Sequence, residues 1–186
     1  MHPIAKYSFS RAFLISWQDI KATIKFGTIL LVCAFLISSC AENKPDDTSQ
    51  EVTKLEVDKS ARELRLYNGS RVIRTMDIGL GFNPVGHKFR EGDGKTPQGR
   101  YYIDRKNPYS SFHLSLGISY PNANDRRKAW NKGYSPGGDI MIHGLPNNGS
   151  IPKQRDWTRG CIAVTNAEIE YLYKVVDVGT PIIISE

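Results

Sequence analysis

The sequence predicts a mainly β fold, a barrel-like β-sandwich with one late α-helix at about residues 166–177. Short segments that alternate apolar and polar residues recur from Val52 to the end of the chain. Between two of them stands Asn68-Gly69, a strong signal for a type I′ hairpin turn. Only one stretch repeats its apolar residues at helical spacing. Many short strands with a single helix are typical of barrels and sandwiches.

The expected strands follow one another along the chain. Two of them flank Asn68-Gly69 within residues 54–80, and Leu64 and Leu66 fall on one face there. The segment "GDGKTPQGRYYI", residues 92–103, gathers glycines and a proline into a turn that leads into another strand. Further strands are expected within "FHLSLGISY" (112–120) and "GDIMIHGL" (138–145), and "IIIS" (182–185) closes the chain as a buried strand.

The helix begins with a capping box, in which the Thr165 hydroxyl and the Glu168 carboxylate satisfy otherwise unpaired amides. Its apolar residues then recur at helical spacing and predict one buried stripe: Ile169, Leu172, Tyr173 and Val176. Gly179 and Pro181 end it. The basic run 126–128 is interpreted as a solvated loop.

Composition and charge exclude some classes of function. With 40% hydrophobic and 10% aromatic residues the chain is globular rather than disordered. Its net charge of +6 includes four Lys/Arg and one acidic residue within positions 1–40, which leaves 21 basic against 18 acidic residues elsewhere. No dense basic run and no nucleic-acid motif accompanies this mild excess, so nucleic acid is not an expected partner.

The first forty residues resemble a lipoprotein signal. The apolar run "FGTILLVCAFLI" (26–37) follows Lys21 and Lys25, and it is shorter than the roughly 20 residues that a spanning helix needs. It ends in "ISSC" (37–40), which predicts lipidation of Cys40 and membrane attachment through that lipid. A simple membrane anchor, or a signal cut elsewhere, is the alternative. Residues 41–51 form a polar linker and 52–186 the folded domain.

This segment also predicts the location, the bacterial cell envelope. A lipid-bearing Cys40 makes the chain a periplasmic or outer-membrane lipoprotein, with outer-membrane sorting as the default because Ala41 rather than Asp follows the cysteine. Cys161 is then alone in the mature chain, since Cys33 belongs to the signal. An unpaired thiol in such a compartment is either a buried apolar group or a reactive one.

A catalytic thiol needs a base, and three histidines are available beyond residue 40. His143, at the end of a predicted strand, is the best candidate, whereas His87 lies in a loop and His113 within a strand. Gly160 lets the backbone approach a substrate, and the amides of Gly160 and Cys161 are expected to form an oxyanion hole. Zinc motifs are absent from the sequence, so no metal and no cofactor is expected.

"IHG" (142–144) followed by "TRGC" (158–161) resembles the L,D-transpeptidase catalytic domain of bacterial cell walls, in the subgroup with Thr-Arg-Gly-Cys in place of Ser-His-Gly-Cys. The resemblance covers about Val52–Glu186 and implies a mostly β barrel-like sandwich. It implies that Cys161 is the nucleophile and that His143 is the base, oriented by the Gly144 carbonyl.

Thr158, Arg159 and His113 are predicted to be substrate-binding residues. Thr158 and Gly160 match the motif that leads to the thiol. Arg159 stands where better-known members have a second histidine, and there it either favours the thiolate or binds a stem-peptide carboxylate. His113 is expected to hydrogen-bond within the wall of the active site.

The implied reaction is acyl transfer on peptidoglycan stem peptides. The thiolate attacks the third residue of a stem tetrapeptide and expels the terminal D-Ala. The thioester then passes to an amine of another stem, or to a lysine of an envelope lipoprotein. A hydrolase of the same chemistry and a lipid-tethered wall-binding module with an inert thiol remain open as alternatives.

Overall fold

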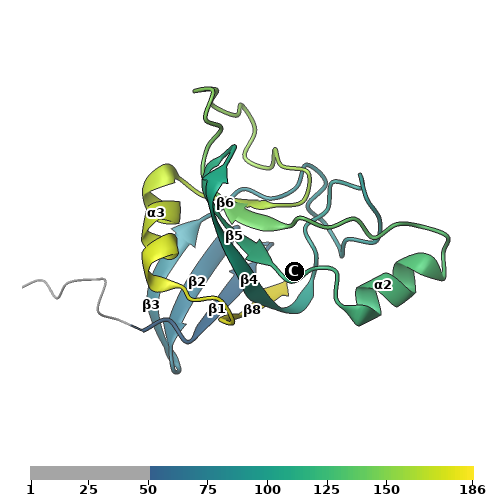
Figure 1. Cartoon of the computed structure of the whole chain (residues 1–186), viewed down its shortest axis with the longest axis horizontal. Helices are drawn as coiled ribbons and strands as arrows, with labels where there is room; N and C mark the ends of the chain where they lie inside the picture. The colour runs from purple at the N-terminus through teal and green to yellow at the C-terminus, as the bar shows by residue number, and fades with distance from the viewer. Residues whose placement is uncertain (1–50) are drawn as a thin grey trace, which may run out of the picture. The chain divides into compact units, whose positions relative to one another are not determined.

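The computed structural model describes residues 51–186. The predicted signal segment 1–40, the lipidation site Cys40 and residues 41–50 of the linker lie outside the described residues, so the predictions about them stay predictions. Figure 1 shows the described part as strands with two helices. The mainly β prediction is confirmed.

Eight strands form one mixed sheet in the order β3-β2-β1-β8-β4-β5-β6-β7. Their bounds are β1 Lys54–Asp58, β2 Glu63–Asn68, β3 Arg71–Asp77, β4 Gly99–Ser110, β5 His113–Ile118, β6 Met141–His143, β7 Ile162–Ala163 and β8 Pro181–Ser185. The helices are α2, Ala123–Trp130, and α3, Asn166–Val175. β1 pairs in parallel with β8, and β6 with β7, whereas the other neighbours are antiparallel.

The long strand β4 joins two halves of the sheet. Its first residues, 99–102, pair with β8, and its later residues, 103–110, pair with β5 in a ladder that contains register shifts. At the far ends of the strand order, two isolated bridges connect the chain that follows β3 to the neighbourhood of β7. These bridges join Gly79 with Ala163 and Gly81 with Thr158. The described sheet is therefore open, because β3 and β7 do not pair as strands. The two bridges nevertheless bring its two edges together, as in a barrel.

The core lies between the two halves of the sheet and α3. Alternate residues of the strands are fully buried, among them Leu55, Leu64, Leu66, Ile103, Leu116, Ile142, Ile162 and Ile182. Ile169 and Leu172 of α3 join the same cluster against β5 and β6. Each fully buried Leu or Ile contributes about 1.5–3 kcal/mol. This shared core holds the ends of β6 and β7 side by side.

The hairpin between β2 and β3 is confirmed, but its turn differs from the expected one. Asn68 pairs with Arg71, so the two turn residues are Gly69 and Ser70 rather than Asn68-Gly69. Of these two, Gly69 has a positive φ, 58°. A single positive φ at the first turn position is typical of a type II′ turn, which accepts glycine there.

The basic run 126–128, interpreted from the sequence as a loop, lies within the helix α2, which stands to one side of the sheet in Figure 1. The Asn122 side chain accepts from the Asn124 and Asp125 amides, and the Asp125 carboxylate accepts from the Asn122 amide. This capping box starts the helix without an apolar stripe, because Asp125 and Ala129 are its buried residues. Hydrophobic periodicity therefore could not indicate it.

Replacing Asp125 with alanine is expected to lower the free energy of unfolding by about 2–4 kcal/mol. Its carboxylate is 5% exposed and accepts from the Tyr101 hydroxyl at 2.9 Å. It also contacts His87 Nε2 at 3.3 Å. Urea titration of Asp125→Ala beside Arg126→Ala, an exposed neighbour expected to change stability by less than about 0.5 kcal/mol, measures this. Equal stability of the two variants would show that the contacts of Asp125 with Tyr101 and His87 do not contribute to the free energy of unfolding.

Candidate active site

His143 ends β6 and is 4% exposed. Its Nδ1 lies 2.7 Å from the Gly144 carbonyl oxygen. Since a carbonyl only accepts, Nδ1–H is the donor, and the lone pair of the neutral ring is left on Nε2. Burial lowers the pKa of His143, which keeps the imidazole neutral and able to accept a proton at neutral pH.

Two aromatic rings hold this imidazole. The Phe112 ring lies 4.6 Å and the Trp157 ring 5.5 Å from it, centroid to centroid. Phe112 comes from the tip of the β4–β5 hairpin, and Trp157 from the loop that precedes β7. The ring orientation of His143 is therefore set by packing as well as by its hydrogen bond.

Cys161 immediately precedes β7, whose pairing with β6 sets Ala163 opposite His143. The thiol and the imidazole line one cavity of about 290 Å³, together with the hairpin tip residues Tyr109, Ser110, Ser111 and Phe112. The thiol donates to the Asp139 carbonyl oxygen at 3.5 Å. Burial raises the pKa of Cys161, and a hydrogen bond from the Met141 amide opposes this in part.

The turn before the thiol is built by Thr158. Its buried hydroxyl donates to the Cys161 carbonyl oxygen at 2.7 Å and accepts from the Gly160 amide at 3.1 Å. The Gly160 amide is thus already paired, contrary to its expected place in an oxyanion hole, and the Cys161 amide is left as the candidate donor. Gly160 has φ 129°, and a Cβ there would lie 2.6 Å from the Lys95 carbonyl oxygen.

Two of the predicted substrate-binding residues lie elsewhere. Arg159 is exposed and does not line the cavity that holds Cys161. The His113 ring turns to α3, where its Nε2 lies 2.7 Å from a Glu170 carboxylate oxygen. Neither side chain reaches the thiol in this structure. The structure therefore brings together Cys161, His143, Gly144, Thr158 and Gly160.

Lys88 was not anticipated from the sequence. Its charge lowers the pKa of Cys161, but this effect is smaller than the rise caused by burial and by the charge of Asp139. Its ammonium is 3% exposed and is held by Asp93 at 2.8 Å. No sequence pattern marks this residue, because the loop that carries it, 82–98, is distant in the chain from both catalytic candidates.

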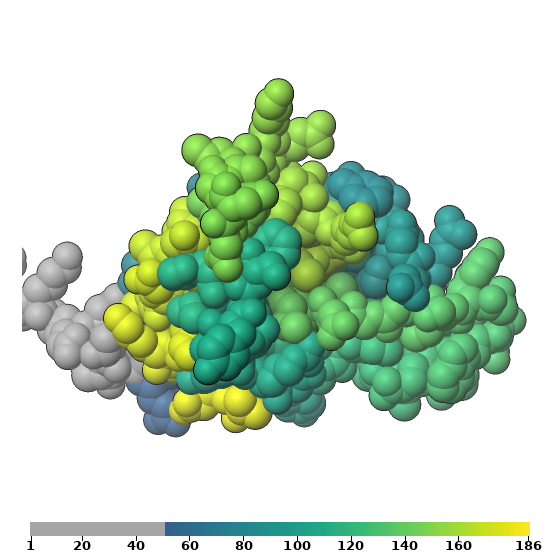
Figure 2. Space-filling view, turned by 45° about the horizontal axis from the view of Figure 1, so that its top comes forward, coloured from purple at the N-terminus to yellow at the C-terminus, as the bar shows by residue number. Residues whose placement is uncertain are grey.

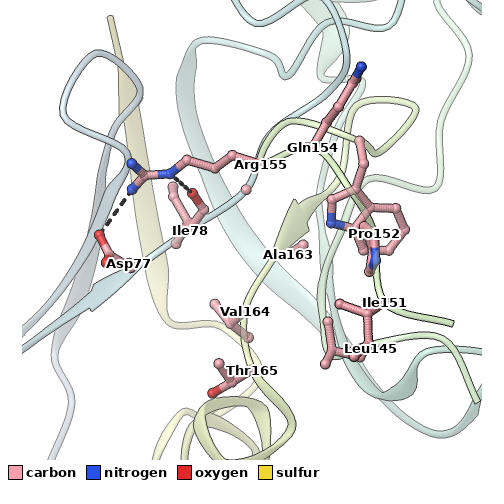
Figure 3. Close-up of a pocket in the computed structure, with 12 residues that line it drawn as sticks. Asp77, Ile78, Leu145, Ile151, Pro152, Gln154, Arg155, Ala163, Val164 and Thr165 are labelled. Carbon is pink, nitrogen blue, oxygen red and sulfur yellow. Dashed lines mark hydrogen bonds and ion pairs between the residues drawn. The ribbon is translucent and has the colours of Figure 1, made fainter. Parts of the chain in front are cut away.

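A second hollow, of about 240 Å³, lies on the other side of the chain that leads into β7 (Figure 3). Arg155 closes one end of it by bonding to an Asp77 carboxylate oxygen at 3.0 Å and to the Ile78 carbonyl oxygen at 3.2 Å. Ile151, Pro152, Leu145 and Val164 supply apolar walls. Trp157 contacts His143 and also lines this hollow, so it separates the two cavities.

Within residues 51–186, no group of three or more His, Cys, Asp or Glu side chains is placed to hold a metal ion. Over the same residues, the helices are too short or too polar to cross a membrane.

The reaction of resting Cys161 with iodoacetamide is expected to accelerate with pH beyond about 8.5, the ordinary thiol pKa. A raised pKa means that the thiolate, which is the nucleophile, forms only at higher pH than in a free peptide. At pH 7 the folded protein should therefore react more slowly than a peptide of residues 157–165. Mass spectrometry of the alkylated protein over pH 6–10 measures both rates. An alkylation rate that does not change above pH 7 would contradict a raised pKa of the Cys161 thiol.

The fold and the site together define a mainly β domain that brings one cysteine and one histidine into a shared cleft. The chain belongs to the L,D-transpeptidase catalytic domain family, whose model matches residues 53–184. Over 94 residues it is 34% identical to a protein of Escherichia coli named "Putative L,D-transpeptidase YafK", a match that covers 50% of this chain and 32% of that protein.

Solved structures agree with this fold. The helical cell shape determining protein Pgp2 of Campylobacter jejuni matches with a TM-score of 0.58 and 32% identity, covering 74% of this chain and 49% of that one. Bd1075 of Bdellovibrio bacteriovorus matches with a TM-score of 0.52 and 28% identity, covering 74% and 49%. The chain thus spans about half the length of these structures and about a third of the matched E. coli protein.

Proposed function

We propose that this protein is a cysteine-dependent L,D-transpeptidase that acts on peptidoglycan stem peptides. The observation that carries the proposal is the shared cavity of Cys161 and His143, in which the Gly144 carbonyl fixes Nδ1–H and leaves Nε2 as a base. Membership of the L,D-transpeptidase family supports the class of substrate.

The reaction begins with a proton transfer. Nε2 of His143 takes the Sγ proton, which in the resting state points to the Asp139 carbonyl. The imidazolium that forms is stabilised by the Nδ1–H bond to the Gly144 carbonyl. The sulfur attacks the carbonyl carbon of the third stem residue, and the Cys161 amide donates to the oxyanion.

The tetrahedral intermediate collapses as the bond to the terminal D-Ala nitrogen breaks. His143 returns its proton to that amine, which leaves, and the acyl group remains on sulfur as a thioester. The amine of a second stem then attacks the thioester carbonyl, and His143 takes a proton from the attacking nitrogen. The C–S bond breaks, and His143 passes that proton to the departing sulfur, which restores the thiol. The product is a 3→3 cross-link.

The wall of the cleft favours an amine over water as acceptor. Phe112 and Trp157 cover the imidazole with apolar rings, which limits the access of bulk water to the thioester. We further propose that a lipid on Cys40 holds the enzyme in the cell envelope, as a periplasmic or outer-membrane lipoprotein that faces peptidoglycan. A lysine of an envelope lipoprotein is then a second possible acceptor.

The proposal is tested by incubating the protein with a disaccharide-tetrapeptide and following intact mass and soluble muropeptides. The expected result is an adduct on Cys161, equal in mass to the stem without its D-Ala, together with a dimeric muropeptide. An adduct that resolves only to the tripeptide would assign a hydrolase of the same chemistry. Folded protein that gives neither adduct nor product would favour a wall-binding module.

A further inference from the structure

A third cavity, of about 380 Å³, lies between loop 82–98 and the chain that follows α2. In Figure 2 this loop, blue-teal at the upper right, lies above the green segment that contains α2, and the Glu91 amide donates to the Ser135 carbonyl oxygen at 2.8 Å. We call this cavity the basic pocket. Its charged and aromatic walls are Phe89, Arg90, Asp93, Lys95, Lys132 and Tyr134.

The loop around the pocket is organised by one carboxylate, Asp93, whose two oxygens accept four hydrogen bonds. Asp93 Oδ1 accepts from Lys88 Nζ at 2.8 Å and from the Lys95 amide at 3.0 Å, and Oδ2 accepts from the amides of Phe89 and Arg90 at 2.8 and 3.1 Å. Four donors fix the loop around this group, and buried Lys88 neutralises its charge. Asp93 therefore shapes the pocket without leaving a free anion in it.

Three cations remain on the walls. Arg90 lies over the Tyr134 ring, with Cζ 5.4 Å from its centroid, and Lys132 Nζ lies 5.0 Å from the centroid of Phe89. Lys95 hydrogen-bonds to the Val85 carbonyl. Because Arg90 and Lys132 already lie on aromatic rings, they lose less conformational freedom on ligand binding than unrestrained side chains would. Glu91, the nearest acidic neighbour in the chain, contacts Ser135 at 3.4 Å and is not part of the wall.

The basic pocket adjoins the thiol through the backbone. The Lys95 carbonyl lies so close to Gly160 that a Cβ there would be 2.6 Å from its oxygen, and Gly94 packs against Gly81 beside it. Lys88, which is paired with Asp93 at 2.8 Å, belongs to the same loop. The pocket therefore borders the turn that carries Cys161, and we expect a peptide whose carbonyl sits at the thiol to extend toward it.

We propose that the basic pocket binds a free carboxylate of the stem peptide, with Arg90 and Lys132 as the contacting cations, and so selects acidic over amidated stems. This inference rests on the proposed function for the identity of the ligand. Carboxylate binding, which the sequence suggested for Arg159, is thereby assigned to Arg90 and Lys132. An apolar rim of Phe89 and Tyr134 beside the cations suits a ligand that carries aliphatic carbons next to its carboxylate.

The test measures dissociation constants by calorimetry in a Cys161→Ala background, where binding occurs without reaction. The ligand is the disaccharide-tetrapeptide, beside the same compound with its carboxylates amidated. Arg90→Gln and Lys132→Gln are each expected to weaken binding about five- to ten-fold, as for a partly exposed charge-assisted hydrogen bond. Arg126→Gln and Lys128→Gln, on the exposed face of α2, make the same charge changes nearby and are expected to have no effect.

Several outcomes would contradict the proposal that the basic pocket binds a carboxylate. Equal binding of the amidated ligand would do so, as would equal weakening by the α2 variants, which indicates a diffuse charge effect. A loss of affinity confined to Arg159→Gln would instead support the sequence-based prediction that Arg159 binds the carboxylate. Failure of the proposed function looks different, because the pocket variants would still lose affinity while wild-type protein forms no adduct on Cys161. Conversely, an adduct that forms at unchanged KM in the pocket variants refutes the pocket alone.

Discussion

His143→Gln is expected to slow acylation of Cys161 by the tetrapeptide by about 10³-fold, within the range of general-base catalysis. Burial raises the pKa of the thiol, so few molecules carry a thiolate unless a neighbouring base removes the proton. The variant keeps a polar side chain between Phe112 and Trp157, but it has no basic nitrogen. Cys161→Ala, which lacks the sulfur, is expected to form no adduct.

The measurement is the rate of adduct formation by intact mass over pH 4–10. In the wild-type protein the rate should rise as His143 loses its proton, and it should do so below pH 6.5, because burial lowers the pKa of this imidazole. In His143→Gln that step should vanish, leaving a rate that grows with hydroxide. His113→Gln is the comparison, since that imidazole bonds to Glu170. An equal loss in His113→Gln would contradict the assignment of His143.

Gly160→Ala is expected to lower the free energy of unfolding by about 2–4 kcal/mol, or to displace the thiol with a loss of acylation of more than about 100-fold. The added methyl group would meet the Lys95 carbonyl oxygen at 2.6 Å, and φ 129° is strained for any residue with a Cβ. The neighbour is backbone in a loop fixed by Asp93, so it cannot move aside cheaply.

Gly69→Ala is the matched control for this substitution. Gly69 also has a positive φ, 58°, but no atom lies within 4 Å of the position of an added Cβ. It is expected to cost only about 1 kcal/mol and to leave acylation unchanged. Thermal unfolding with calorimetry, followed by the acylation rate of each variant, measures both effects. Equal stability and activity of the two variants would show that the contact with Lys95 has no consequence.

Much of the fold could be predicted locally. Alternation predicted the strands because each side chain of a strand faces either the core or the solvent. The capping box at Thr165 and the stripe of Ile169 and Leu172 predicted α3, although Val176 is already extended and the helix ends at Val175. α2 was missed, because a helix with two buried residues leaves no apolar period and its cap is made by Asn122 and Asp125.

The sequence by itself determined which side chains are available for chemistry, a lone cysteine after Cys40 and a histidine at a strand end, because residue type and local periodicity are properties of the chain. Only the tertiary structure decided their surroundings. It paired the Gly160 amide with Thr158, turned His113 to Glu170 and buried Lys88 against Asp93. Hydrogen bonds, burial and Coulomb forces act between residues that are close in space, and loop 82–98, which is far from Gly160 in the chain, meets it only in the folded protein.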